Sequence, residues 1–187
     1  MNMFHRPNSS IINNLILVFF TFMSCAQDKE HELSLSSLFT DGMVLQRDTL
    51  VSIWGRSTPN QLVTLNSSWG SIDSIRSDNN GDWIVRIPTN SNPGPHSFTI
   101  TSGKDVKNIK DVLFGEVWLA AGQSNMEMDF DYCCNSTDMA SKELADADYP
   151  MIRMFNVKKA LEYEPTIHVE GQWVRAVGKD ITTFSAV

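Results

Sequence analysis

Ser124 is the residue best placed for covalent chemistry, because it lies in Gly122-Gln123-Ser124-Asn125, directly after an apolar run. Residues 117–121 carry no charge and predict a buried strand, apolar on both faces as parallel strands tend to be. Gly122 interrupts that strand, and residues 125–128 are suited to begin a helix. A serine at a strand-to-helix turn has an accessible hydroxyl, and the helix N-terminus faces any oxyanion that forms. The pattern indicates nucleophilic catalysis.

The tetrapeptide alone also fits a plain turn, since all four residue types are common in turns. It is not the Gly-x-Ser-x-Gly elbow of the α/β-hydrolases. Its context favours the nucleophile, because residues 111–128, Asp-Val-Leu-Phe-Gly-Glu-Val-Trp-Leu-Ala-Ala-Gly-Gln-Ser-Asn-Met-Glu-Met, resemble the sialate O-acetylesterase family of the SGNH hydrolases. Further matches to this family lie at residues 38–47, 149–155, 171–173 and 184–187. The resemblance extends from about Leu33 to the last residue.

The resemblance implies a role for each residue of the motif. Ser124 would attack the acetyl carbonyl and form an acyl-enzyme that water releases, with its own backbone amide as one oxyanion donor. Gly122, Gln123 and Asn125 would shape the turn and the oxyanion pocket. The substrate implied is an O-acetylated sialic acid or another acetylated sugar. The family reaction implies neither a cofactor nor a metal.

A serine hydroxyl needs a base to take its proton. The family supplies this base from a C-terminal Asp-x-x-His block, and it supplies an oxyanion glycine and asparagine from intermediate blocks. After Ser124 the sequence has one histidine, His168, and Pro165 stands where that block has aspartate. We therefore interpret His168 as a surface residue on an edge strand. The sequence predicts the N-terminal portion of a longer esterase, truncated or degenerate.

Two other functions fit the sequence. One is a non-catalytic exported sugar-binding or interaction module with a vestigial esterase segment. The other is a different SGNH ester hydrolase, such as a lipase-like enzyme. The net charge of -7 and the lack of any basic stripe argue against nucleic acid as a partner.

The N-terminus predicts export. Residues 15–23 form an apolar run that is too short to span a bilayer and fits a signal-peptide core. Ser24-Cys25 resembles the end of a bacterial lipobox, with Cys25 lipidated, whereas Ser24-x-Ala26 fits ordinary cleavage before Gln27. We prefer the lipoprotein, because it explains the lone cysteine. The protein would be periplasmic or anchored to a bacterial membrane through Cys25.

The two remaining cysteines, Cys133 and Cys134, are adjacent, and a disulfide between neighbours requires a distorted geometry. A metal site would need more cysteines or histidines at ligand spacing, so none is predicted.

The pattern changes in the middle of the chain. Residues 33–110 contain short alternating strands with frequent turn signals, which predict a β-sandwich, including a tight hairpin around Asp41-Gly42. Trp54, Trp69 and Trp83 could form a sugar platform, but aromatic core residues are the better interpretation. His96 is expected to be structural or exposed.

From Asp111 the pattern becomes α/β. A helix is expected from about Met139 to Ala147, with strands at 151–157 and 173–177. The predicted organisation is a signal peptide (1–25), a tether (26–32), an all-β sandwich (33–110) and the start of a flavodoxin-like α/β/α SGNH domain (111–187).

Overall fold

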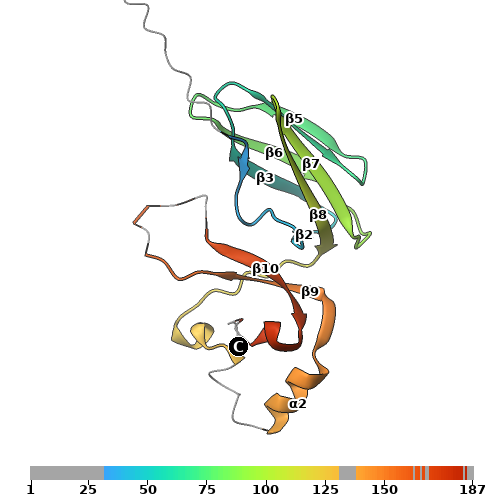
Figure 1. Ribbon diagram of the computed structural model, residues 1–187, viewed down its shortest axis with the longest axis vertical. Coiled ribbons are helices and arrows are strands. Elements are labelled where there is room, and N and C mark those ends of the chain that lie inside the picture. Colours follow the sequence, from blue (N-terminus) through green and yellow to red (C-terminus); the bar gives the residue numbers. More distant parts are fainter. Residues whose placement is uncertain are drawn as a thin grey trace, which may run out of the picture.

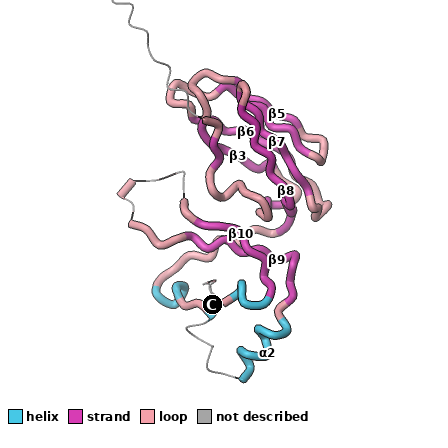
Figure 2. Tube along the Cα trace, viewed as in Figure 1, coloured by secondary structure: helices cyan, strands magenta, loops and turns pink. Residues whose placement is uncertain are grey.

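The computed structural model describes residues 32–130, 138–161, 163–164, 166, 169–182 and 184, and it is built mainly from strands with few helices (Figures 1 and 2). The elements in chain order are β1 (Ser34–Leu35), β2 (Val44–Gln46), β3 (Leu50–Arg56), β4 (Leu62–Ser67), β5 (Ile72–Arg76), β6 (Asp82–Pro88), β7 (His96–Ser102), β8 (Asp105–Gly115), η1 (Ser124–Glu127), α2 (Asp138–Asp146), β9 (Asp148–Val157), β10 (Gly171–Val177) and η2 (Gly178–Ile181).

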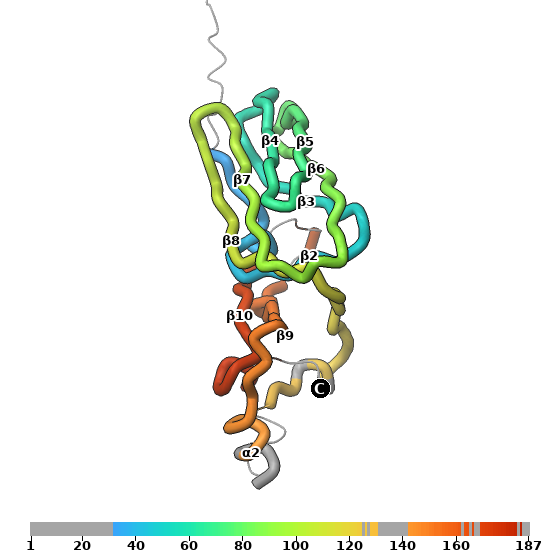
Figure 3. Tube along the Cα trace, turned by 90° about the vertical axis from the view of Figure 1, so that its right-hand side faces the viewer, coloured from blue at the N-terminus to red at the C-terminus, as the bar shows by residue number. Residues whose placement is uncertain are grey.

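The first eight strands form two sheets. One has the order β1-β3-β6 and is antiparallel, and the other has the order β2-β8-β7-β4-β5. In the second sheet β2 runs parallel to β8, and the other pairs are antiparallel. Figure 3 shows these strands together in one half of the molecule and β9, β10 and α2 in the other.

Alternating side chains put these strands against a common core. In β6, Trp83, Val85 and Ile87 are buried whereas Ile84 is exposed, which is the alternation expected of a strand with one face in water. Side chains from both sheets meet in one cluster, including Ile53, Val85 and Ile87 from the first and Val63, Leu65, Phe98, Ile100, Ile109, Val112 and Phe114 from the second. The strands predicted in this region are therefore confirmed. We call this unit of residues 33–115 the β-sheet domain.

The aromatic residues of this domain belong to its interior. Trp83 is buried in the core, and Trp54 and Trp69 are partly buried against it. The Trp54 ring makes an edge contact with Phe39 at 4.6 Å between centroids. The core interpretation of the three tryptophans is confirmed.

The predicted hairpin around Asp41-Gly42 is wrong. The turn exists, with Gly42 at φ 80° and the Met43 amide donating to the Thr40 carbonyl at 3.3 Å. However, β1 and β2 on either side belong to different sheets. Local turn chemistry favours a reversal, but long-range pairing with β3 and β8 determines where each strand goes.

Strand β8 extends across the predicted boundary between residues 110 and 111. Val112, Leu113 and Phe114 are buried, and β2 pairs with β8 up to Gly115. Relative to β7, β8 carries one extra residue between Ile109 and Val112, which makes a bulge. The chain leaves the sheet only after Gly115.

The second half contains a hairpin of β9 and β10, paired antiparallel with Val174 opposite Met154. The sequence predicted parallel strands here, so the parallel order is corrected for this pair. Antiparallel pairing needs no crossover helix between the two strands. The helix expected near 139–147 is confirmed as α2. Within the described residues, no helix has the length and apolar character needed to cross a membrane.

We predict that replacing Ile87 with alanine lowers the free energy of unfolding by about 2–5 kcal/mol, because it removes a fully buried side chain and leaves a cavity. Ile84→Ala on the same strand is the matched control, since Ile84 is more than half exposed. It should change stability by less than about 0.5 kcal/mol. Urea unfolding of both variants measures the difference, and equal losses would contradict the assigned faces of β6.

Candidate active site

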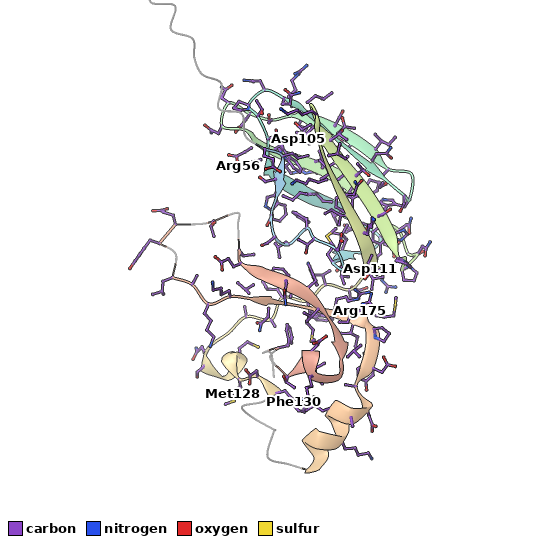
Figure 4. The ribbon with its side chains drawn as sticks, in the orientation of Figure 1. Arg56, Asp105, Asp111, Met128, Phe130 and Arg175 are labelled. Carbon is purple, nitrogen blue, oxygen red and sulfur yellow. The ribbon has the colours of Figure 1, made fainter. Side chains whose placement is uncertain are left out.

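Ser124 is exposed and begins η1, a single turn of 3-10 helix. The Met126 amide donates to the Gln123 carbonyl at 2.9 Å and closes the turn. A Cβ atom on Gly122 would lie 3.2 Å from the Met126 side chain, so the backbone approaches this side chain closely. The helix expected at 125–128 is therefore reduced to one turn, and it is too short to direct a helix dipole at Ser124. Figure 4 labels Met128 and Phe130 just beyond this turn.

The predicted buried strand at 117–121 is wrong. Residues 116–122 have no regular secondary structure, and the side chains of Trp118 and Leu119 are 87% and 92% exposed. A strand requires hydrogen-bonded neighbours, and the pairing of β2 with β8 ends at Gly115. An apolar run is buried only where another element covers it, and the side chains of Trp118 and Leu119 are not covered.

Side chains from the end of β2 hold the start of this segment. The Val117 amide donates to Gln46 Oε1 at 2.8 Å, and Gln46 Nε2 donates to Glu116 at 2.9 Å. Arg47 Nε lies 2.8 Å from the other Glu116 oxygen. The hydrogen bond from Gln46, followed by that from Arg47, holds the pKa of Glu116 below its usual value. Gln46 thus continues the strand pairing by one step after the backbone ladder ends.

A cleft of about 850 Å³ lies beside this segment. One wall consists of residues 115–120, and the opposite wall is formed by residues 151–157 of β9, with Trp173 and Phe184 also lining it. The first wall ends at Ala120, four positions before Ser124. The volume is typical of a small-molecule site.

A cluster of charged side chains joins β9 and β10 to the β-sheet domain. Arg153 donates to both oxygens of Asp111, with Nη1 at 2.8 Å and Nη2 at 3.2 Å, and Arg175 Nη2 lies 3.0 Å from the same carboxylate. Figure 4 labels Asp111 and Arg175 at the junction of the two halves. The hydrogen bond from Arg153 is the main cause that lowers the pKa of Asp111; partial burial opposes it, and Arg175 lowers the pKa further.

Several residues singled out from the sequence lie outside the described part of the chain. They are Cys25, Cys133, Cys134, Pro165 and His168. His96 is described and is buried, with Nε2 2.9 Å from the Asn92 carbonyl oxygen and its ring stacked on Phe114 at 4.2 Å. It is a structural residue. Among the described residues, no cluster of three or more histidine, cysteine or acidic side chains could hold a metal ion.

Comparison with known proteins relates the chain to named esterases. Mouse sialate O-acetylesterase is 34% identical over 134 residues, which cover 65% of this chain and 24% of the mouse protein. The human sialate O-acetylesterase is 27% identical over 159 residues, covering 78% of this chain and 30% of the human protein. The rat sialate O-acetylesterase is 32% identical over 148 residues, covering 73% of this chain and 26% of the rat protein. The chain belongs to the sialate O-acetylesterase family. No family model matches it.

The solved structures agree with this assignment. A carbohydrate acetylesterase from Xanthomonas citri matches with a TM-score of 0.74 and 31% sequence identity, covering 82% of this chain and 35% of that protein. The chain therefore spans about a quarter to a third of the length of these sialate O-acetylesterase relatives and of this structural neighbour.

The sequence singles out Ser124 as a candidate nucleophile, but it does not predict the contact between Asp111 and Arg153. Both residues lie in blocks that resemble the sialate O-acetylesterases, at residues 111–128 and 149–155. Their positions in these two blocks were the only indication in the sequence that the residues matter. It could not show that the two blocks meet, because their contact crosses 42 positions of sequence.

We predict that Asp111→Asn removes a pH-dependent part of the stability. Because the pKa of folded Asp111 lies below its ordinary 3.8, the folded state binds fewer protons there, so the stabilisation is complete above that ordinary value and is lost as the pH falls through the folded pKa. Urea unfolding at about pH 6 should show a loss of about 1–3 kcal/mol in the variant, and the difference from the native protein should shrink at about pH 3. A difference that is the same at both pH values would contradict this.

Proposed function

We propose that the protein is a carbohydrate esterase that removes O-acetyl groups from sialic acids or other acetylated sugars through an acyl-enzyme on Ser124. The observation that carries this proposal is the position of Ser124, exposed on a tight turn at the end of the block that resembles the family. The names of the relatives support the choice of an acetyl ester of a sugar.

The proposed reaction has two steps. The Ser124 hydroxyl attacks the acetyl carbonyl carbon while a base takes the hydroxyl proton, and the sugar oxygen leaves with a proton. Water then attacks the acetyl-serine ester, and acetate leaves while the serine regains its proton. The backbone amide of Ser124 serves as one oxyanion donor. The base and the further oxyanion donors come from outside the described residues.

In the proposed fold the two sheets form a β-sandwich that precedes an SGNH-type α/β/α domain beginning near Asp111. Gly122, Gln123 and Asn125 shape the turn beside the substrate.

We also propose that the protein is exported, with Cys25 as the site of a lipid anchor in a bacterial envelope. The apolar run at 15–23 and the Ser24-Cys25 pair support this location. The acetylated sugar is the partner, and the acidic charge of the chain argues against nucleic acid.

The alternative function is a non-catalytic sugar-binding or interaction module. The observation that favours it is the closed core of the β-sheet domain, which does not involve Ser124. In this alternative the esterase segment is vestigial.

Replacing Ser124 with alanine tests the choice. Acetyl release from p-nitrophenyl acetate and from an O-acetylated sialic acid should fall by at least about a thousandfold, because no nucleophile remains. Ser74→Ala is the control, since Ser74 is an exposed serine on β5, and it should keep the native rate.

Two results would decide for the alternative. One is acetyl release by the native protein and both variants that is no faster than in buffer alone. The other is the absence of release from the native protein together with sugar binding that survives the loss of the Ser124 hydroxyl.

A further inference from the structure

The β9–β10 hairpin meets the β-sheet domain through a buried cation. The Arg153 side chain is only 5% exposed, and its Nε donates to the Pro150 carbonyl within the hairpin at 3.0 Å. The rest of the guanidinium faces the other half of the molecule. It forms the two-pronged contact with Asp111 and approaches the Gly42 carbonyl at 3.4 Å. An arginine in this position is satisfied only while the two halves are together.

The backbone of the β-sheet domain holds Asp111 in place. Asp111 lies in the β8 bulge at φ 54°, a conformation uncommon for residues other than glycine. Its neighbour Lys110 donates its amide to Asp41 at 2.8 Å and accepts from the Gly42 amide at 3.1 Å. The Asp41-Gly42 turn thus holds both the amide and the carbonyl of Lys110, the residue before Asp111. The bulge directs the acidic group toward the hairpin.

A second contact supports the same docking. The Trp173 indole Nε1 donates to the Leu38 carbonyl at 2.9 Å, and its ring packs against the core of the β-sheet domain. On the other side the ring contacts Phe155 of β9 at 5.4 Å between centroids. Trp173 therefore reports whether the hairpin is seated.

We propose that Asp111 and Arg153 are positioning residues, whose ion pair locks the β9–β10 hairpin onto the β-sheet domain and so fixes the cleft beside the Ser124 segment. One wall of the cleft is attached to this domain through Gln46 and Glu116. The other wall is β9, and it is attached through Arg153. Arg175 adds a weaker contact, since more than half of its side chain is in water.

Through this ion pair the β-sheet domain sets the shape of the cleft, although it does not itself contact the substrate. Each wall is attached separately to the β-sheet domain, so release of the hairpin changes the spacing of the walls while the core of the domain stays folded. The consequence for acetyl transfer rests on the proposed function. The lock itself does not.

Indole N–H signals in two-dimensional ¹H–¹⁵N spectra of the whole protein can test this lock. The chain has five tryptophans, and substitution of each by phenylalanine assigns its signal. Trp83 reports the core of the β-sheet domain, and Trp173 reports the seated hairpin. Both are read in one sample, so local release is distinguished from global unfolding.

Arg153→Met keeps an apolar side chain of similar length but removes the guanidinium group. Asp111→Asn removes the negative charge with a residue that tolerates a positive φ angle. In both variants the Trp173 indole signal should move toward the position of an exposed indole, and its hydrogen should exchange with solvent at least about tenfold faster. The Trp83 signal should stay unchanged. Arg153→Lys keeps the positive charge but cannot donate to both Asp111 oxygens in the same way, so it should shift the Trp173 indole signal less.

Arg56→Met is the matched control, because Arg56 pairs with Asp82 at 2.7 Å on the surface of the β-sheet domain. It should leave the Trp173 signal in place. An unchanged Trp173 signal in both Arg153→Met and Asp111→Asn would overturn the proposal. Parallel changes of the Trp173 and Trp83 signals in these two variants and in Arg153→Lys would also overturn it. Selective release of Trp173 in a protein that hydrolyses no acetyl ester supports the lock and counts only against the esterase function.

Discussion

Burial of the inward faces of two sheets in one core is the constraint on which the rest of the structure depends. Every strand of the β-sheet domain contributes through period-two alternation or through the turns at its ends. The remaining elements are attached to this body at one edge, where β2 and β8 run parallel. The position of the hairpin, of the cleft and of the segment that leads to Ser124 is therefore set by how each is fastened to that edge.

The strands of this core were predictable because burial leaves a direct mark on the sequence. Ile84 and Ile87 are the same residue type on opposite faces of β6, which is the alternation that the sequence pattern predicts for such strands. What the pattern could not supply was the choice of partner. The Asp41-Gly42 turn has the chemistry of a hairpin, yet it connects strands of different sheets, because pairing between strands is a long-range choice that turn residues do not determine.

The candidate site divides in the same way. Ser124 is predicted as the nucleophile from its local context, since a serine in a glycine-containing turn after an apolar run is a short-range pattern. The ion pair of Asp111 with Arg153 could not be found, because it depends on a bulge in β8 and on the docking of a hairpin. Nothing in the two sequence blocks indicates which acidic residue meets which arginine.

The wrong prediction of a buried strand at residues 117–121 is the most informative, because the composition and the conformation of these residues disagree. An apolar segment with strand propensity that remains irregular and exposed shows that the local preference is not met by its surroundings. The start of this segment is held by the hydrogen bonds of Gln46 with Val117 and Glu116. The β-sheet domain thus fixes where this segment begins, through contacts to Glu116 and Val117.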